Sequence, residues 1–139
     1  MTTSDQVVLV VEDNTTNMVL FRDLLRSRGY TVLQAMDGTT GWQMAQEHFP
    51  NLILLDIQLP GLTGLEVIRM LKEDKKLQSI PVIAVTAFAM KGDKETCLRN
   101  GFDAYISKPI SVSDFLETVS QFLSSSTDET LSCVNDVAR

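Results

Sequence analysis

Acidic, hydroxyl and basic residues follow the apolar segments of this sequence at intervals along the chain. Carboxylates are suitable ligands for a hard divalent cation such as Mg²⁺, which prefers oxygen. A lysine provides a compact positive charge for phosphate, and a threonine hydroxyl can donate a hydrogen bond to a phosphate oxygen. Together such groups suit phosphoryl transfer, in which catalysis is mostly positioning and neutralisation of charge. The residues concerned are Glu12, Asp13, Asp56, Thr86 and Lys108.

Asp56 is the best candidate for a nucleophile, because a carboxylate can accept a phosphoryl group as an aspartyl phosphate. Three carboxylates without a counter-charge would repel one another and raise one another's pKa. A cation, Mg²⁺ or Mn²⁺, and Lys108 would offset this repulsion and the charge of the phosphoryl group. Alone, each residue has an ordinary interpretation: Asp56 can begin a turn and Thr86 is common in strands. Their positions after different predicted strands favour a shared site.

The elements that must position these residues alternate along the chain. Apolar segments at 7–11, 52–55 and 81–85 predict buried strands, and weaker strands fit 31–35 and 104–107. Amphipathic patterns predict helices around 18–25, at 39–47, 63–74 and 93–100, and after 111. This alternation predicts an α/β fold, a doubly wound five-stranded parallel sheet with five helices on its two faces. Ligands of such sheets bind at the carboxyl ends of the strands, where the candidate residues lie.

Length and charge limit the possible functions. With 139 residues, the chain has room for one domain, predicted at 6–123 with a short lead at 1–5 and a flexible tail at 124–139. The net charge of -6 disfavours binding to nucleic acid or to an anionic membrane. No apolar stretch approaches the roughly 20 residues of a membrane span, and no signal peptide is evident. We therefore expect a cytoplasmic protein.

Four motifs resemble those of the response-regulator receiver (CheY-like) family. They are Val10-Val11-Glu12-Asp13-Asn14, Leu54-Leu55-Asp56-Ile57-Gln58-Leu59-Pro60-Gly61, Ala84-Val85-Thr86-Ala87 and Ser107-Lys108-Pro109. The resemblance covers about residues 6–123 and implies a flavodoxin-like sheet of order 2-1-3-4-5. It also implies a phosphoacceptor of two-component signalling whose donor is a histidine kinase or a histidine phosphotransfer protein. Residues 85–93 and 104–112 are most similar to single-domain family members that regulate the cell cycle.

The resemblance assigns a role in metal binding to four residues. Asp13 and Asp56 would hold Mg²⁺ directly, and Gln58 would contribute its backbone carbonyl. Glu12 would act through water. Many members have Asp at this first acidic position. The resemblance therefore does not settle the water-mediated contact of Glu12, but it does imply the metal site.

The resemblance also implies a switch that responds to the phosphoryl group. The Thr86 hydroxyl would move toward the phosphate while the Tyr105 ring turns inward. Lys108 would contact the phosphoryl oxygens. The Lys108-Pro109 bond would be cis, a form that has a low energetic cost only before proline.

The segment Phe88-Ala89-Met90 is apolar where a surface loop is usually polar. It either packs on the following helix or forms a partner surface that phosphorylation reshapes. The resemblance implies output through protein contacts on the face of the fourth helix, fifth strand and fifth helix. We expect a monomer or weak dimer.

Other functions fit the residues less well. A phosphatase of the haloacid-dehalogenase type needs a second Asp as general acid where this chain has Gln58. A flavodoxin needs a hydroxyl- and glycine-rich loop for phosphate where this chain has Glu12 and Asp13. A receiver excised from a hybrid histidine kinase, and a receiver-like module that binds partners without phosphorylation, remain as alternatives.

Overall fold

Strands and helices alternate along the chain in the computed structural model, which describes residues 6–87 and 93–123. They are β1 (Val7–Val11), α1 (Thr15–Ser27), β2 (Thr31–Ala35), α2 (Gly38–His48), β3 (Leu52–Asp56), α3 (Gly64–Glu73), β4 (Val82–Thr86), α4 (Asp93–Arg99), β5 (Ala104–Ser107) and α5 (Val112–Phe122). Within those ranges, none of the helices combines the length and the apolar character that crossing a membrane would require. The predicted lead, the predicted tail and the segment with Phe88 and Met90 lie outside the described residues.

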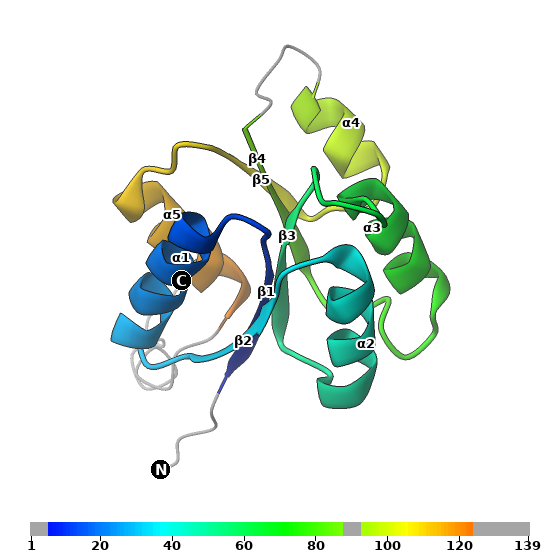
Figure 1. Ribbon diagram of the computed structural model, residues 1–139, viewed down its shortest axis with the longest axis horizontal. Coiled ribbons are helices and arrows are strands. Elements are labelled where there is room, and N and C mark those ends of the chain that lie inside the picture. Colours follow the sequence, from blue (N-terminus) through cyan, green and yellow to red (C-terminus); the bar gives the residue numbers. More distant parts are fainter. Residues whose placement is uncertain (1–5, 88–92, 124–139) are drawn as a thin grey trace, which may run out of the picture.

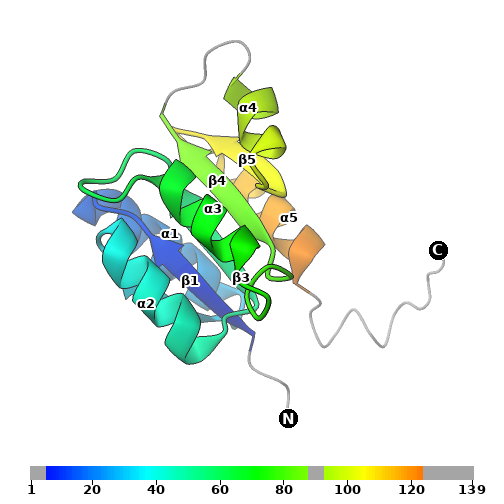
Figure 2. The ribbon, with the colours of Figure 1, turned by 90° about the vertical axis from the view of Figure 1, so that its right-hand side faces the viewer.

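The strands form one parallel sheet with the order β2-β1-β3-β4-β5, which confirms the predicted 2-1-3-4-5 topology. The sheet lies between two layers of helices, α1 and α5 on one face and α2, α3 and α4 on the other (Figure 1). Figure 2, turned by 90°, shows α2 and α3 running across their face of the sheet. The parallel register pairs Val11 with Leu55 and Asp56 with Val85. The carboxyl ends of β1, β3 and β4 therefore meet at one edge.

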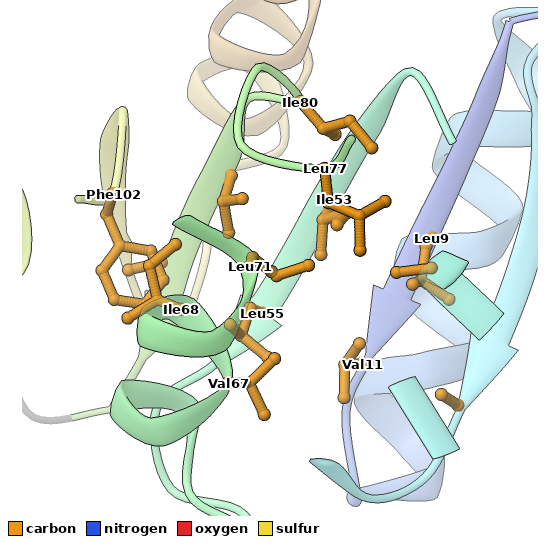
Figure 3. Packing of buried hydrophobic residues seen from close by; sticks show 14 of the residues in the cluster. Leu9, Val11, Ile53, Leu55, Val67, Ile68, Leu71, Leu77, Ile80 and Phe102 are labelled. Carbon is orange, nitrogen blue, oxygen red and sulfur yellow. The ribbon is translucent and has the colours of Figure 1, made fainter. Parts of the chain in front are cut away.

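The central strands are apolar because both of their faces are covered. Alternate side chains of β1 and β3 enter different clusters, since successive residues of a strand point to opposite faces. Figure 3 shows one cluster, in which Leu9 and Leu55 of the sheet pack with Val67, Ile68 and other residues of α3 and its surroundings. The second cluster lies under α1 and α5 and includes the stacked rings of Phe21 and Phe115, whose centroids are 5.2 Å apart. The two clusters cover the two faces of the sheet.

Capping residues precede α1, α2, α3 and α5, and the apolar pattern alone does not separate such a residue from the helix. Thr63 is the N-cap of α3, where it forms a capping box with Glu66. Ser111 is the N-cap of α5 and accepts a hydrogen bond from the Asp114 backbone N–H. Residues 63 and 74, predicted as helical, thus flank α3, because a cap residue has an extended backbone.

Candidate functional site

The predicted site residues meet at the carboxyl edge of the sheet. Strand β1 runs upward in Figure 1, so this edge is at the top. Glu12 and Asp13 directly follow β1, and Asp56 is the last residue of β3. Carboxylate oxygens of these three residues lie within 4.8 Å of one another. Lys108, which directly follows β5, joins them, with Nζ 2.8 Å from Glu12 Oε1 and 2.9 Å from Asp56 Oδ2.

Asp56 is held in one orientation by contacts to both carboxylate oxygens. Oδ1 accepts a hydrogen bond of 3.0 Å from the Gln58 backbone N–H. Oδ2 accepts one of 2.9 Å from the Lys108 ammonium. Asp56 is only 4% exposed because β3 is covered on both faces. The structure therefore holds the carboxylate in a fixed orientation, which favours its attack on a correctly placed phosphoryl group.

Lys108 reaches the acids from the edge strand. Its backbone N–H donates a 2.8 Å hydrogen bond to the Thr86 carbonyl, which anchors the residue beside the end of β4. The Lys108-Pro109 peptide bond is cis. Burial alone would lower the pKa of Lys108, but its interactions with Glu12 and Asp56 outweigh burial and raise that pKa above its ordinary value. The lysine is consequently charged at neutral pH.

Glu12 is the most deeply buried of the three acids, at 1% exposure. Burial raises its pKa above the ordinary 4.5, the nearby Lys108 ammonium opposes the rise, and the charge of Asp56 adds to it. Oε2 accepts a hydrogen bond from the Asn14 backbone N–H at 3.1 Å. Oε1 is buried and forms a 2.8 Å ion pair with the Lys108 ammonium. The same carboxylate belongs to the cluster of three acids that could hold a metal ion.

The donor set fits a hard divalent cation. It combines the exposed Asp13 carboxylate with the buried carboxylates of Asp56 and Glu12, all from neighbouring strand ends. Mg²⁺ takes oxygen ligands, uses one or two carboxylates and keeps several waters. The exposure of Asp13 leaves one side of the cluster open to such waters. A bound cation would therefore offset the repulsion among the three carboxylates.

Thr86 and Tyr105 lie on paired strands. Thr86 ends β4 and is buried, while Tyr105 of β5 is half-buried and packs against the cluster of Figure 3. In the register, Tyr105 pairs with Ala84, two residues before Thr86. The predicted switch residues are therefore on adjacent strands, and their predicted movements stay a prediction.

Three residues that contact the site residues or the loop after Asp56 were not identified from the sequence. Asn14 binds Glu12 through its backbone and caps α1 through its side chain, which accepts from the Asn17 N–H. An Asn before a helical pattern is a recognisable N-cap signal. Gly38 and Gly64, the first residues of α2 and α3, pack against the loop after Asp56. No sequence pattern indicates what a glycine touches.

The burial of Glu12 leads to a prediction about stability. Its pKa is raised on folding, so its favourable contribution to stability is complete at low pH and is lost as pH rises through the folded pKa. In metal-free protein, Glu12→Gln should therefore increase the free energy of unfolding at neutral pH. The increase should shrink at mildly acidic pH, where wild-type Glu12 becomes protonated. Urea unfolding with a chelator at both pH values measures the difference.

A matched control is Glu117→Gln, which changes an exposed glutamate of α5. It should leave the free energy of unfolding nearly unchanged at both pH values. If Glu12→Gln destabilised the metal-free protein at neutral pH, the inferred strain on the buried carboxylate would be wrong.

The fold and site together define a class of protein. A family model described as the response regulator receiver domain matches residues 8–120, and the chain belongs to that family. It is 55% identical over 116 residues to the polar-differentiation response regulator DivK of Brucella ovis. That match covers 84% of this chain and 94% of the relative. The chain is a DivK homologue and a phosphoacceptor domain of two-component signalling. The two alternative kinds of receiver are not favoured.

Solved structures agree with this assignment. The receiver domain of a sensor histidine kinase from Pseudomonas aeruginosa is 33% identical with a TM-score of 0.79, over 86% of this chain and 98% of that one. In that structure a magnesium ion is coordinated in the active-site cleft. The chemotaxis protein CheY4 of Vibrio cholerae has a TM-score of 0.80 at 23% identity, over 86% of this chain and 100% of that one, and supports the fold.

Proposed function

We propose that Asp56 is the residue that accepts the phosphoryl group, in a reaction that needs Mg²⁺ or Mn²⁺. One observation carries this proposal: the Asp56 carboxylate, with two further acids within 4.8 Å, has the Lys108 ammonium 2.9 Å from Oδ2. These groups come from three separate strand ends. Such an arrangement suits the transfer of a phosphoryl group. Without the Lys108 ammonium or a bound metal ion, the three carboxylates would repel one another.

The reaction joins an Asp56 oxygen to phosphorus. As this P–O bond forms, the bond from phosphorus to the donor breaks, and the leaving group departs with the electron pair. The leaving group is imidazole from a phosphohistidine or acetate from acetyl phosphate. The product is an acyl phosphate on Asp56. Lys108 is charged and offsets the negative charge brought by the phosphoryl oxygens.

Other residues would orient the incoming group. Asp13, Asp56 and the Gln58 backbone carbonyl would hold Mg²⁺ directly, and Glu12 would hold it through water. The bound cation would supply charge neutralisation at the phosphoryl oxygens. The Thr86 hydroxyl would donate a hydrogen bond to one of these oxygens, and Tyr105 would follow its movement. Gln58 stands where a hydrolase would need a general acid, so turnover of external substrates is not expected.

The partners are proteins. The donor would be a histidine kinase or a histidine phosphotransfer protein, as membership of a two-component family requires. Similarity to DivK suggests a role in polar differentiation. We propose output through the face of α4, β5 and α5, where Leu98 and Val112 are exposed apolar side chains. A monomer or weak dimer, and a cytoplasmic location, stay predictions.

Removal of the metal tests the proposal in the unmodified protein. With acetyl phosphate and Mg²⁺, a phosphate-affinity gel should show a retarded band, and Mn²⁺ should replace Mg²⁺. With a chelator the retarded band should be absent, because the clustered carboxylates then repel the donor. A retarded band of equal intensity in the presence of the chelator would contradict a metal-dependent reaction.

A further inference from the structure

The first residue of α3 lies directly against the backbone of the proposed phosphoacceptor. A Cβ atom added at Gly64 would lie 2.6 Å from the Ile57 Cα and still closer to the Asp56 carbonyl oxygen. Both are backbone atoms, so rotation of a side chain cannot remove the overlap. The Gly64 N–H also donates a 2.9 Å hydrogen bond to the Ile57 carbonyl. The absence of a side chain at Gly64 is what permits this contact.

A second glycine makes an equivalent contact at the far end of the same loop. A Cβ atom at Gly38, the first residue of α2, would overlap the Leu62 carbonyl oxygen and lie 3.1 Å from the Leu62 carbonyl carbon. The loop between β3 and α3 is thus in contact with a buried glycine at each end. Between these contacts, the Gln58 N–H donates to Asp56 Oδ1 at 3.0 Å. Displacement of either end would therefore be transmitted to the site.

We propose that Gly64 and Gly38 are positioning residues for the metal site, which hold Asp56 and Gln58 where the cation requires them. This inference rests on the proposed function. Gly64 acts on the Asp56 backbone directly, whereas Gly38 acts only through Leu62. The two glycines have no polar side chain and do not touch the cation themselves.

Helix propensity and the proposed positioning role predict different effects when these glycines are replaced by alanine, which makes the inference testable. Alanine is a better helix former than glycine, and neither Gly64 nor Gly38 has the positive φ that would exclude alanine. On propensity alone, Gly64→Ala and Gly38→Ala would stabilise the protein. A loss of metal affinity must then come from the contact with the loop.

The experiment measures Mg²⁺ affinity without relying on phosphorylation. Urea unfolding over a series of MgCl₂ concentrations gives the dissociation constant, because a ligand that binds only the folded state raises stability by a known function of its concentration. Changes in residues that support a metal site typically cost 10- to 100-fold in affinity. We expect a dissociation constant raised roughly 10- to 100-fold in Gly64→Ala, and about 10-fold in Gly38→Ala.

Two control variants separate positioning from general destabilisation. Val119→Ala opens the core under α5, on the opposite face of the sheet. Gly29→Ala strains a glycine with φ of 88° that has no neighbour within 4 Å. Both should lower stability and leave the Mg²⁺ dissociation constant unchanged. An equal loss of affinity in Val119→Ala would overturn the positioning role.

The outcomes distinguish an error in the positioning role of the glycines from an error in the proposed function. If wild type and Asp56→Asn gain equal stability from Mg²⁺, the proposed site itself is wrong. If wild type binds and Asp56→Asn does not, but both glycine variants bind like wild type, only the positioning role is wrong. Should Gly64→Ala fail to fold, Gly38→Ala decides: unchanged affinity there overturns the inference, and weakened affinity supports it.

Discussion

Asp56→Asn is expected to abolish the retarded band that wild type gives with acetyl phosphate and Mg²⁺. The amide is close in size to the carboxylate and can still accept the Gln58 hydrogen bond. It lacks the charge that attracts the cation and the nucleophilic oxygen that forms an acyl phosphate. The phosphorylated fraction on a phosphate-affinity gel should therefore fall from most of the protein to none.

The matched control is Asp103→Asn. Asp103 is also an ion-paired aspartate, with Oδ2 accepting from the Val82 N–H at 2.8 Å and lying 3.7 Å from Lys72 Nζ. Val82 begins β4, so this pair lies at the amino end of the sheet. Asp103→Asn should be phosphorylated like wild type. Equal bands for wild type and Asp56→Asn would show that another residue accepts the group.

Lys108→Met should slow phosphorylation strongly and also destabilise the metal-free protein. Loss of a donor that stabilises transition-state charge typically costs roughly 100- to 1000-fold in rate. Glu12 and Asp56 would also remain buried without their counter-charge. Breaking one partner of a buried pair costs about 3 kcal/mol. The rate is measured at saturating Mg²⁺, and the free energy of unfolding is measured with a chelator.

Lys72→Met is the corresponding control at the other end of the sheet. Lys72 is also partly buried, and its ammonium donates to the Gln78 and Ile80 carbonyls at 3.1 Å and 3.3 Å. Its loss should lower stability without changing the phosphorylation rate of the folded protein. If Lys72→Met slowed the reaction as much as Lys108→Met, the effect of Lys108 would be one of stability alone.

The sequence predicts most of the fold because burial imposes a visible pattern. Strands β3 and β4 are buried at every position, so each appears in the sequence as an unbroken apolar segment. Each segment ends at a conspicuous polar residue. That is why Asp56 and Thr86 could be identified. The order of the strands came from the family resemblance, since an apolar segment does not indicate its neighbours in the sheet.

Properties that depend on distance could not be predicted. The direction of the Lys108 pKa is set by opposing effects of burial and two carboxylates, whose balance requires coordinates. The burial of Glu12 beside Lys108 and the backbone contacts of Gly38 and Gly64 are likewise features of packing. A glycine at the start of a helix looks the same in the sequence whether it faces solvent or a carbonyl oxygen.

The position of Lys108 just after β5 affects one edge of the sheet. β5 is an edge strand of four residues, bonded to one neighbour only. Fraying of this margin would withdraw the ammonium from Glu12 and Asp56 and leave two anions in apolar surroundings. The ion pairs of Lys108 therefore oppose the detachment of β5, which has few hydrogen bonds to the sheet. The proposed phosphorylation site thus also stabilises this edge of the sheet.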